Sequence, residues 1–222
     1  FVIFLLASAV GAVSTVHDDS FARMILGDGY VNMTIDNIRS GDPMGVYKRS
    51  GEVEMFLAIG FNNVLVAFKA FAMGAMASIG TAYILFTNGV MLGTFQTFFQ
   101  QYDLLGESAV VVWIHGTIEI SSIVVAGAAG FAMGNGILFP GTYTRMTAFR
   151  RGAKRGMKVV IGMIPFFVVA AFLESFVTRH TDMPIALSLF IIGGSLTLVL
   201  WYFVLYPRSV FRRVAHGGQT GD

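Results

Sequence analysis

The 222-residue sequence contains no cysteine and few charged residues. Without a thiol there can be no disulfide bond, no zinc–thiolate site and no cysteine nucleophile. Charged residues make up only 13% of the chain, whereas about 25% is usual in soluble domains. So few charges leave too little polar surface to cover a globule in water. The composition therefore excludes an ordinary soluble domain.

Hydrophobic residues take the place of the missing charges, at 55% of the chain and a mean hydropathy of +0.70. They form runs long enough to cross a hydrocarbon core about 30 Å thick, which takes about 20 helical residues. We therefore predict an all-α, polytopic transmembrane helix bundle. No basic region precedes the first run, so we interpret that run as a truncated transmembrane helix, not a signal-peptide remnant. The runs predict six spans, at 1–16, 53–76, 79–99, 109–134, 157–178 and 185–206.

Basic residues gather between the fourth and fifth spans and in the tail 207–222. By the positive-inside rule both segments face the cytoplasm. Residues 17–52 are then extracytoplasmic, residues 53–206 form a five-helix membrane bundle, and both termini of this multi-pass protein of the bacterial inner membrane are cytoplasmic. Because membrane spans flank the basic segment, we expect anionic lipid as its partner and not nucleic acid. The lipid-contacting residues would be Arg145, Arg150, Arg151, Lys154, Arg155 and Lys158.

Apolar residues recur at helical spacing in two stretches of the segment 17–52, separated by Gly27 and Gly29. This pattern predicts two short amphipathic helices. They would either cap the ends of the membrane helices or present a surface to a partner protein.

Glycines occur at spacings that suit close helix packing in lipid. We expect a leucine at Gly130 or Gly134 to be much more disruptive than an alanine. The packing would join helices of one chain or, alternatively, two copies in a homo-oligomer. The glycines concerned are Gly89 and Gly93 in the third span and Gly127, Gly130 and Gly134 in the fourth.

Ionisable residues inside the fourth span need an explanation, because an isolated charge at a helix centre costs about 2.5–3.5 kcal/mol on the insertion scale. His115 and Glu119 lie four positions apart, hence on one helix face. Polar residues of other spans lie at similar depths, measured at the helical rise of about 1.5 Å per residue. We predict one intramembrane polar cluster, comprising Asn62, Asn63, Asn88, His115, Glu119 and Glu174.

Three interpretations of this cluster remain open: a hydrogen-bonded knot that fixes helix packing, a proton or ion site, and a metal site. Zinc takes three or four protein ligands, whereas only His115 and Glu119 form a tight local pair, and the motif HExxH is absent. An intramembrane hydrolase is poorly supported, because Ser121 and Ser122 look like ordinary small helix residues. We therefore predict no metal, no cofactor and no catalytic residue.

Residues 61–95, 113–141 and 170–180 together resemble the stage II sporulation protein M family, most specifically in HGTIE and FLESF. The resemblance implies a multi-spanning membrane protein without established enzymatic chemistry. Sporulation members of this family anchor wall hydrolases during septal peptidoglycan remodelling, and other relatives are associated with MoxR-type ATPases. No catalytic role comes with the motif residues, which here are Asn63, Gly89, His115, Gly116, Glu119, Gly130 and Glu174.

These observations favour a non-enzymatic inner-membrane scaffold or anchor of the cell envelope that recruits partner proteins. The alternative is a transporter or permease subunit that uses the polar cluster. A dry cluster with all its hydrogen bonds made would favour the scaffold. A water-filled path that reaches Glu119 would favour transport.

Overall fold

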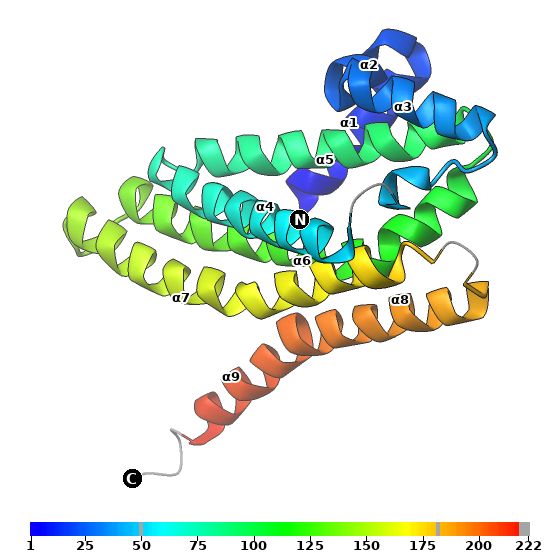
Figure 1. Ribbon diagram of the computed structural model, residues 1–222. Coiled ribbons are helices and arrows are strands. Elements are labelled where there is room, and N and C mark those ends of the chain that lie inside the picture. The colour runs from blue at the N-terminus through cyan, green and yellow to red at the C-terminus, as the bar shows by residue number, and fades with distance from the viewer. Residues whose placement is uncertain (49–50, 181–182, 218–222) are drawn as a thin grey trace.

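The computed structural model describes residues 1–48, 51–180 and 183–217, and within these ranges it is helical with no strand (Figure 1). The predicted all-α bundle is confirmed. The long helices lie roughly side by side, and α6 packs against α4, α5, α7 and α8. They are α1 (Val2–His17), α4 (Glu52–Ala72), α5 (Ile79–Gln100), α6 (Leu105–Leu138), α7 (Arg145–Phe172) and α8 (Ile185–Leu200).

Four of the described helical stretches are long and apolar enough to cross a membrane, namely Glu52–Ala75, Leu105–Leu138, Arg145–Val177 and Ile185–Arg212. Helix α1 is apolar but shorter. Helix α5, which we expected to be a span, has 22 residues but is not among the four. Its threonines, glutamines and asparagine lower its hydropathy, and α1, α2, α4 and α6 cover much of its surface.

The helices extend beyond the apolar runs that predicted them. The segment after Pro140, which lies between the predicted fourth and fifth spans, is helical from Arg145 onwards as the first turns of α7. Thr144 caps this helix by accepting a hydrogen bond from the backbone N–H of Thr147. Hydropathy detects only the apolar part of a helix, so it missed these turns. The tail continues α8 through the π-helical turn η4 (Trp201–Leu205) into α9 (Tyr206–Gly217); residues 218–222 lie outside the described residues.

The segment 17–52 forms the two expected amphipathic helices, α2 (Asp19–Leu26) and α3 (Asp28–Arg39), followed by the short turn η1 (Gly45–Lys48). The side chain of Asp18 caps α2, and hydrogen bonds from the hydroxyl and the backbone N–H of Ser20 lower the pKa of this carboxyl. The apolar faces turn inward, onto α5 and α6. This contact buries Ala22, Val31, Met44, Phe98, Phe99 and Val111.

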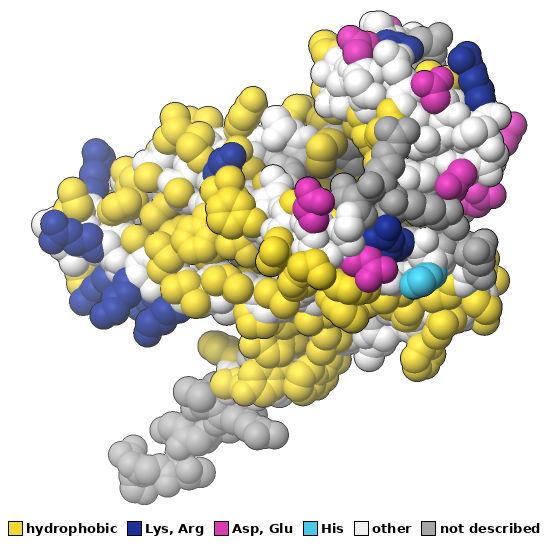
Figure 2. Space-filling view, in the orientation of Figure 1, with side chains coloured by type: hydrophobic (Ala, Val, Ile, Leu, Met, Phe, Trp, Pro, Cys, Tyr) yellow, Lys and Arg dark blue, Asp and Glu magenta, His cyan; other side chains and the backbone are white. Residues whose placement is uncertain are grey.

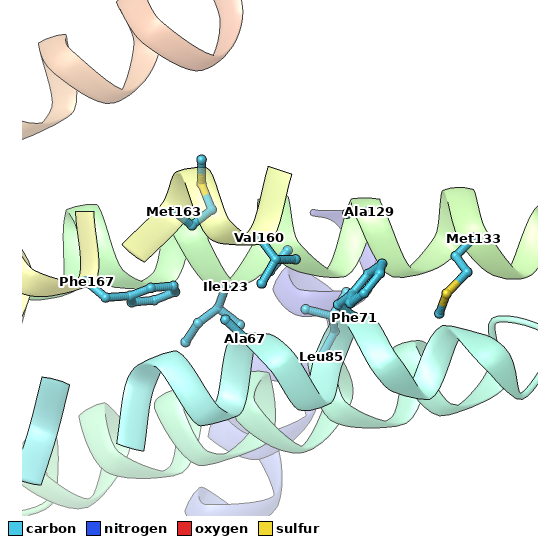
Figure 3. Close-up of a cluster of buried hydrophobic side chains, with 10 residues drawn as sticks. Ala67, Phe71, Leu85, Ile123, Ala129, Met133, Val160, Met163 and Phe167 are labelled. Atoms are coloured by element: carbon cyan, nitrogen blue, oxygen red, sulfur yellow. The ribbon is translucent and has the colours of Figure 1, made fainter. Parts of the chain in front are cut away.

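The central hydrophobic core lies where α4, α5, α6 and α7 meet (Figure 3). Phe71 of α4 and Phe167 of α7 fill it together with smaller side chains of α5 and α6. Its buried members are Ala67, Phe71, Leu85, Ile123, Ala126, Ala129, Met133, Val160, Met163 and Phe167.

Glycines bring α1 into backbone contact with α5 and α4 into backbone contact with α6. A Cβ added at Gly89 would lie 2.6 Å from the carbonyl oxygen of Phe4 in α1, and one at Gly93 would meet the carbonyl of Ser8. A Cβ at Gly130 of α6 would lie 2.6 Å from the carbonyl oxygen of Ala70 in α4. Because that neighbour is backbone and cannot rotate away, even an alanine at Gly130 would force the helices to shift, and the expectation that leucine is more disruptive than alanine stays a prediction.

The other two predicted packing glycines, Gly127 and Gly134, face Leu85 of α5 and the backbone of Gly74. Each of the five thus contacts another helix or turn of the same chain. We call these contacts, between α1 and α5 and among α4, α5, α6 and the turn η2 (Met73–Ala75), the glycine seams.

Charges are distributed unevenly along the bundle (Figure 2). Lysine and arginine side chains gather at the end where α7 begins, and aspartates and glutamates gather toward the end that carries α2 and α3. Hydrophobic side chains cover most of the surface between these ends in this view. This distribution suits a bundle embedded in a bilayer with its charged ends in water.

Candidate functional site

His115 and Glu119 project from one face of α6, four residues apart in a regular helix. His115 is buried, with 6% of its surface exposed, and Glu119 is half-buried. Because α6 lies at the centre of the bundle, this face meets α4 on one side and the end of α7 on another.

Glu174 reaches the same place from η3 (Leu173–Val177), a π-helical turn that continues α7. Its Oε2 lies 3.8 Å from Nε2 of His115. A π-helical turn inserts an extra residue into the helix and so redirects the side chains that follow; such turns are frequent at functional sites.

The Nδ1 edge of the His115 ring contacts Thr178, at the end of η3, and the backbone of α6. Nδ1 lies 3.5 Å from Oγ1 of Thr178, which itself donates a hydrogen bond of 3.1 Å to the carbonyl of Leu173. The ring also interacts with the backbone of Val111, one turn earlier in α6. These contacts fix the ring orientation and direct Nε2 toward Glu174.

Asn63 of α4 completes this group, because its side chain interacts with the Glu119 carboxyl. Asn63 is 5% exposed, and its Nδ2 is buried with no partner within hydrogen-bond distance. Its Oδ1 accepts a long contact of 3.5 Å from Nδ2 of the exposed Asn62. We call Asn63, His115, Glu119 and Glu174 the polar centre; Asn62 lies at its rim.

Asn88 does not join the polar centre in a hydrogen bond. Its Nδ2 donates to the carbonyl of Ile84 in its own helix, at 2.8 Å. It lies instead beside a mostly apolar cavity of about 310 Å³ between α6 and the α1–α2–α3–α5 side of the molecule. His115 and Glu119 also line that cavity.

A second cavity, of about 330 Å³, opens on the α4 side of the same face. We call it the polar cavity, and it is lined by Ala58, Ile59, Asn62, Asn63, His115, Glu119 and Glu174. The face of α6 that carries His115 and Glu119 therefore lies between two hollows and is not packed in the dry core.

The side chains of His115, Glu119 and Glu174 can each offer one ligand atom, and these atoms lie within 4.8 Å of one another. Three such groups form a candidate metal-ligating set, whereas the sequence suggested only a pair. The depth of Glu174 placed it in the cluster, but the π-helical turn that aims it at His115 has no simple sequence signature.

The six basic residues of the predicted lipid contact are exposed in the first turns of α7 and on toward Lys158. Arg151 also lies over the ring of Tyr143, with its guanidinium carbon 4.0 Å from the ring centroid. Their contact with anionic lipid stays a prediction.

An all-helical bundle with an apolar surface, charged ends and a polar centre between its helices defines an integral membrane protein of the multi-helix class. The sequence matches the family model of Stage II sporulation protein M over residues 1–179, and the chain belongs to this family. The match ends before α8 and α9. No curated protein and no solved structure matches the chain significantly.

Proposed function

We propose that this membrane protein takes up a cation, a proton or a metal ion, at the polar centre, as a transporter or permease subunit would. The observation that carries the proposal is how poorly the two carboxyl groups are satisfied. Glu119 interacts with the side chain of Asn63 and Glu174 with the ring of His115, but neither contact is a hydrogen bond of 3.5 Å or less. A polar cluster that served only to fix helix packing would have all its polar groups hydrogen-bonded.

The two cavities support the same proposal. Glu119 lines both, so a small ion could reach it from the α4 side and from the α5 side of α6. Ionisable groups that line a cavity inside a membrane protein mark ion and substrate pathways.

The test compares Glu119→Gln with wild type in a strain that lacks the native gene. Gln keeps the size and hydrogen-bonding capacity of the side chain but can neither ionise nor bind a cation strongly. We expect a folded Glu119→Gln protein that fails to restore the wild-type phenotype. Full restoration would overturn the proposal. The matched control is Glu54→Gln, at an exposed position of α4 outside the polar centre, which should behave as wild type.

We further propose that the basic end of α7 faces the cytoplasm and that α3 faces the outside. Because the chain has no cysteine, single cysteines report orientation without background. In intact cells an impermeant thiol reagent should label Asp36→Cys, whose native side chain is 73% exposed, and leave Lys154→Cys unlabelled. Lys154→Cys should react only after the membrane is opened. The reverse pattern would invert the topology.

Recruitment of envelope partners is the third proposal, and it rests on family membership together with the folded α2–α3 segment. That segment exposes charged side chains, including Asp28, Asp36 and Arg39, at the end opposite to the bases of α7. Wall hydrolases or a MoxR-type ATPase are the candidates that the resemblance suggests. Co-purification from the native membrane, with and without reversal of these charges, would test it.

A further inference from the structure

We infer that the polar centre binds one divalent transition-metal ion, for which Zn²⁺ is the first probe. The ligands would be His115 Nε2 and one carboxylate oxygen each from Glu119 and Glu174. This inference rests on the proposed function, in which the polar centre takes up a cation, and it names the class of cation.

The geometry is close to that of a metal site before the ion is present. Zinc–nitrogen and zinc–oxygen bonds of about 2.0–2.2 Å at tetrahedral angles place ligand atoms roughly 3.4 Å apart. His115 Nε2 and Glu174 Oε2 are 3.8 Å apart, and all three ligand atoms lie within 4.8 Å of one another. Small rotations of two glutamate side chains would close these distances.

The donor set indicates which metals would fit. An imidazole nitrogen favours zinc, iron, nickel and copper over magnesium and calcium, whereas carboxylates accept most divalent ions. Three protein ligands would leave a fourth position open. Two ionised carboxylates would also balance the charge of one dication, so the loaded centre would carry no net charge within the bundle.

An independent observation indicates a missing ligand. Asn63 is 95% buried, with 5% of its surface exposed, and lines the polar cavity, yet its Nδ2 makes no hydrogen bond of 3.5 Å or less and reaches the Glu119 carboxyl only through a longer contact. A water or hydroxide at the open coordination position, or a carboxylate drawn in by the metal, would accept a hydrogen bond from this amide.

The surroundings of the histidine match those of a metal ligand. A metal-binding histidine usually has its second ring nitrogen held by a carbonyl, carboxylate or water, which sets the tautomer and the ring orientation. Here the Nδ1 side faces Thr178, whose hydroxyl is anchored to the carbonyl of Leu173, and the ring interacts with the backbone of Val111. The polar cavity provides the route by which an ion would enter.

The experiment uses the full chain, purified in detergent, freed of any affinity tag and stripped with a chelator. Zn²⁺ is titrated calorimetrically, and bound metal is counted by elemental analysis after gel filtration. We expect one Zn²⁺ per chain, a higher unfolding temperature with Zn²⁺, and visible absorption typical of four-coordinate Co²⁺ when cobalt replaces zinc. Glu174→Gln and Glu119→Gln should each lower the affinity by at least about 100-fold, since even outer contacts of metal ligands are worth 10–100-fold.

Two controls keep the result interpretable. Glu54→Gln should bind Zn²⁺ as wild type does, and each variant is first checked for an unchanged elution profile and helical content. A wild-type protein that binds no Zn²⁺ or Co²⁺, or variants that bind as tightly as wild type, would overturn the inference. If the wild type binds no metal while a folded Glu119→Gln protein is inactive in cells, the metal inference is wrong and the polar centre acts as a proton site. If Glu119→Gln is also active, the proposed function falls too.

Discussion

The glycine seams and the polar centre both bury polar side chains between helices. These side chains are mostly hydrogen-bonded in the seams and poorly hydrogen-bonded in the polar centre. In the seams a hydroxyl usually turns back to a backbone carbonyl: Thr15 donates to Gly11 at 2.8 Å, and Thr81 donates to Ala70 at 2.7 Å. In the polar centre the carboxyl groups of Glu119 and Glu174 are held only by longer contacts.

The difference shows which buried polar groups carry information about function. A helix offers carbonyl oxygens to a threonine or serine hydroxyl within one turn, so burying such a residue costs little free energy. A carboxylate can only accept hydrogen bonds, and helices in lipid have no spare N–H groups to give it. Thr94 of α5 is an exception within the seams, since its buried hydroxyl has no partner, but an unpaired hydroxyl costs less than an unpaired charge.

We expect the largest loss of stability when a glycine of a seam is replaced by a larger residue. Gly130→Leu should prevent the normal bundle from forming, because the added side chain would occupy the backbone of α4. Gly130→Ala should fold but lose about 1–3 kcal/mol, the usual cost of overpacking. Thermal unfolding in detergent measures both. The control is Gly162→Ala in α7, where nothing lies within 4 Å of the added Cβ. A Gly130→Ala protein as stable as the Gly162→Ala protein would show that the seam is loose.

A smaller effect is expected where a seam loses a hydrogen bond but keeps its shape. Thr81→Val removes the donor to the Ala70 carbonyl without changing the volume much. We expect a loss of about 0.5–1.5 kcal/mol, the usual net value of one such bond, read from the same unfolding curves. Thr197→Val provides the comparison, because Thr197 bonds to Gly193 within its own exposed helix turn. Equal losses of unfolding free energy in both proteins would mean that the hydrogen bond across the seam contributes no additional stability.

Much of the architecture could be predicted from hydropathy and spacing, because lipid demands long apolar helices. The glycine pairs and the grouping of His115, Glu119, Glu174 and Asn63 also follow from spacing and depth along the helices. Depth alone could not decide the direction of a side chain around its helix. For this reason Asn88, at a suitable depth on α5, bonds to its own helix instead of joining the polar centre.

Two further features were not found from hydropathy and spacing. The turn η3 rotates Glu174 toward His115, and nothing in the letters LESFV marks a π-helical turn. The basic residues after Pro140 continue α7 as a helix, because lysine, arginine and alanine are good helix formers.

The central claim is that the polar centre is a site and not a structural knot, and the unfolding free energy of Glu119→Leu in metal-free detergent tests it most directly. Few partners lose a hydrogen bond when this carboxyl is removed, and its removal takes away one of two acidic groups whose oxygens lie within 4.8 Å of each other. The account therefore predicts that Glu119→Leu is as stable as wild type or more stable. A loss of about 1–3 kcal/mol, the cost of leaving buried partners unpaired, would show that Glu119 holds the helices together and would contradict the account.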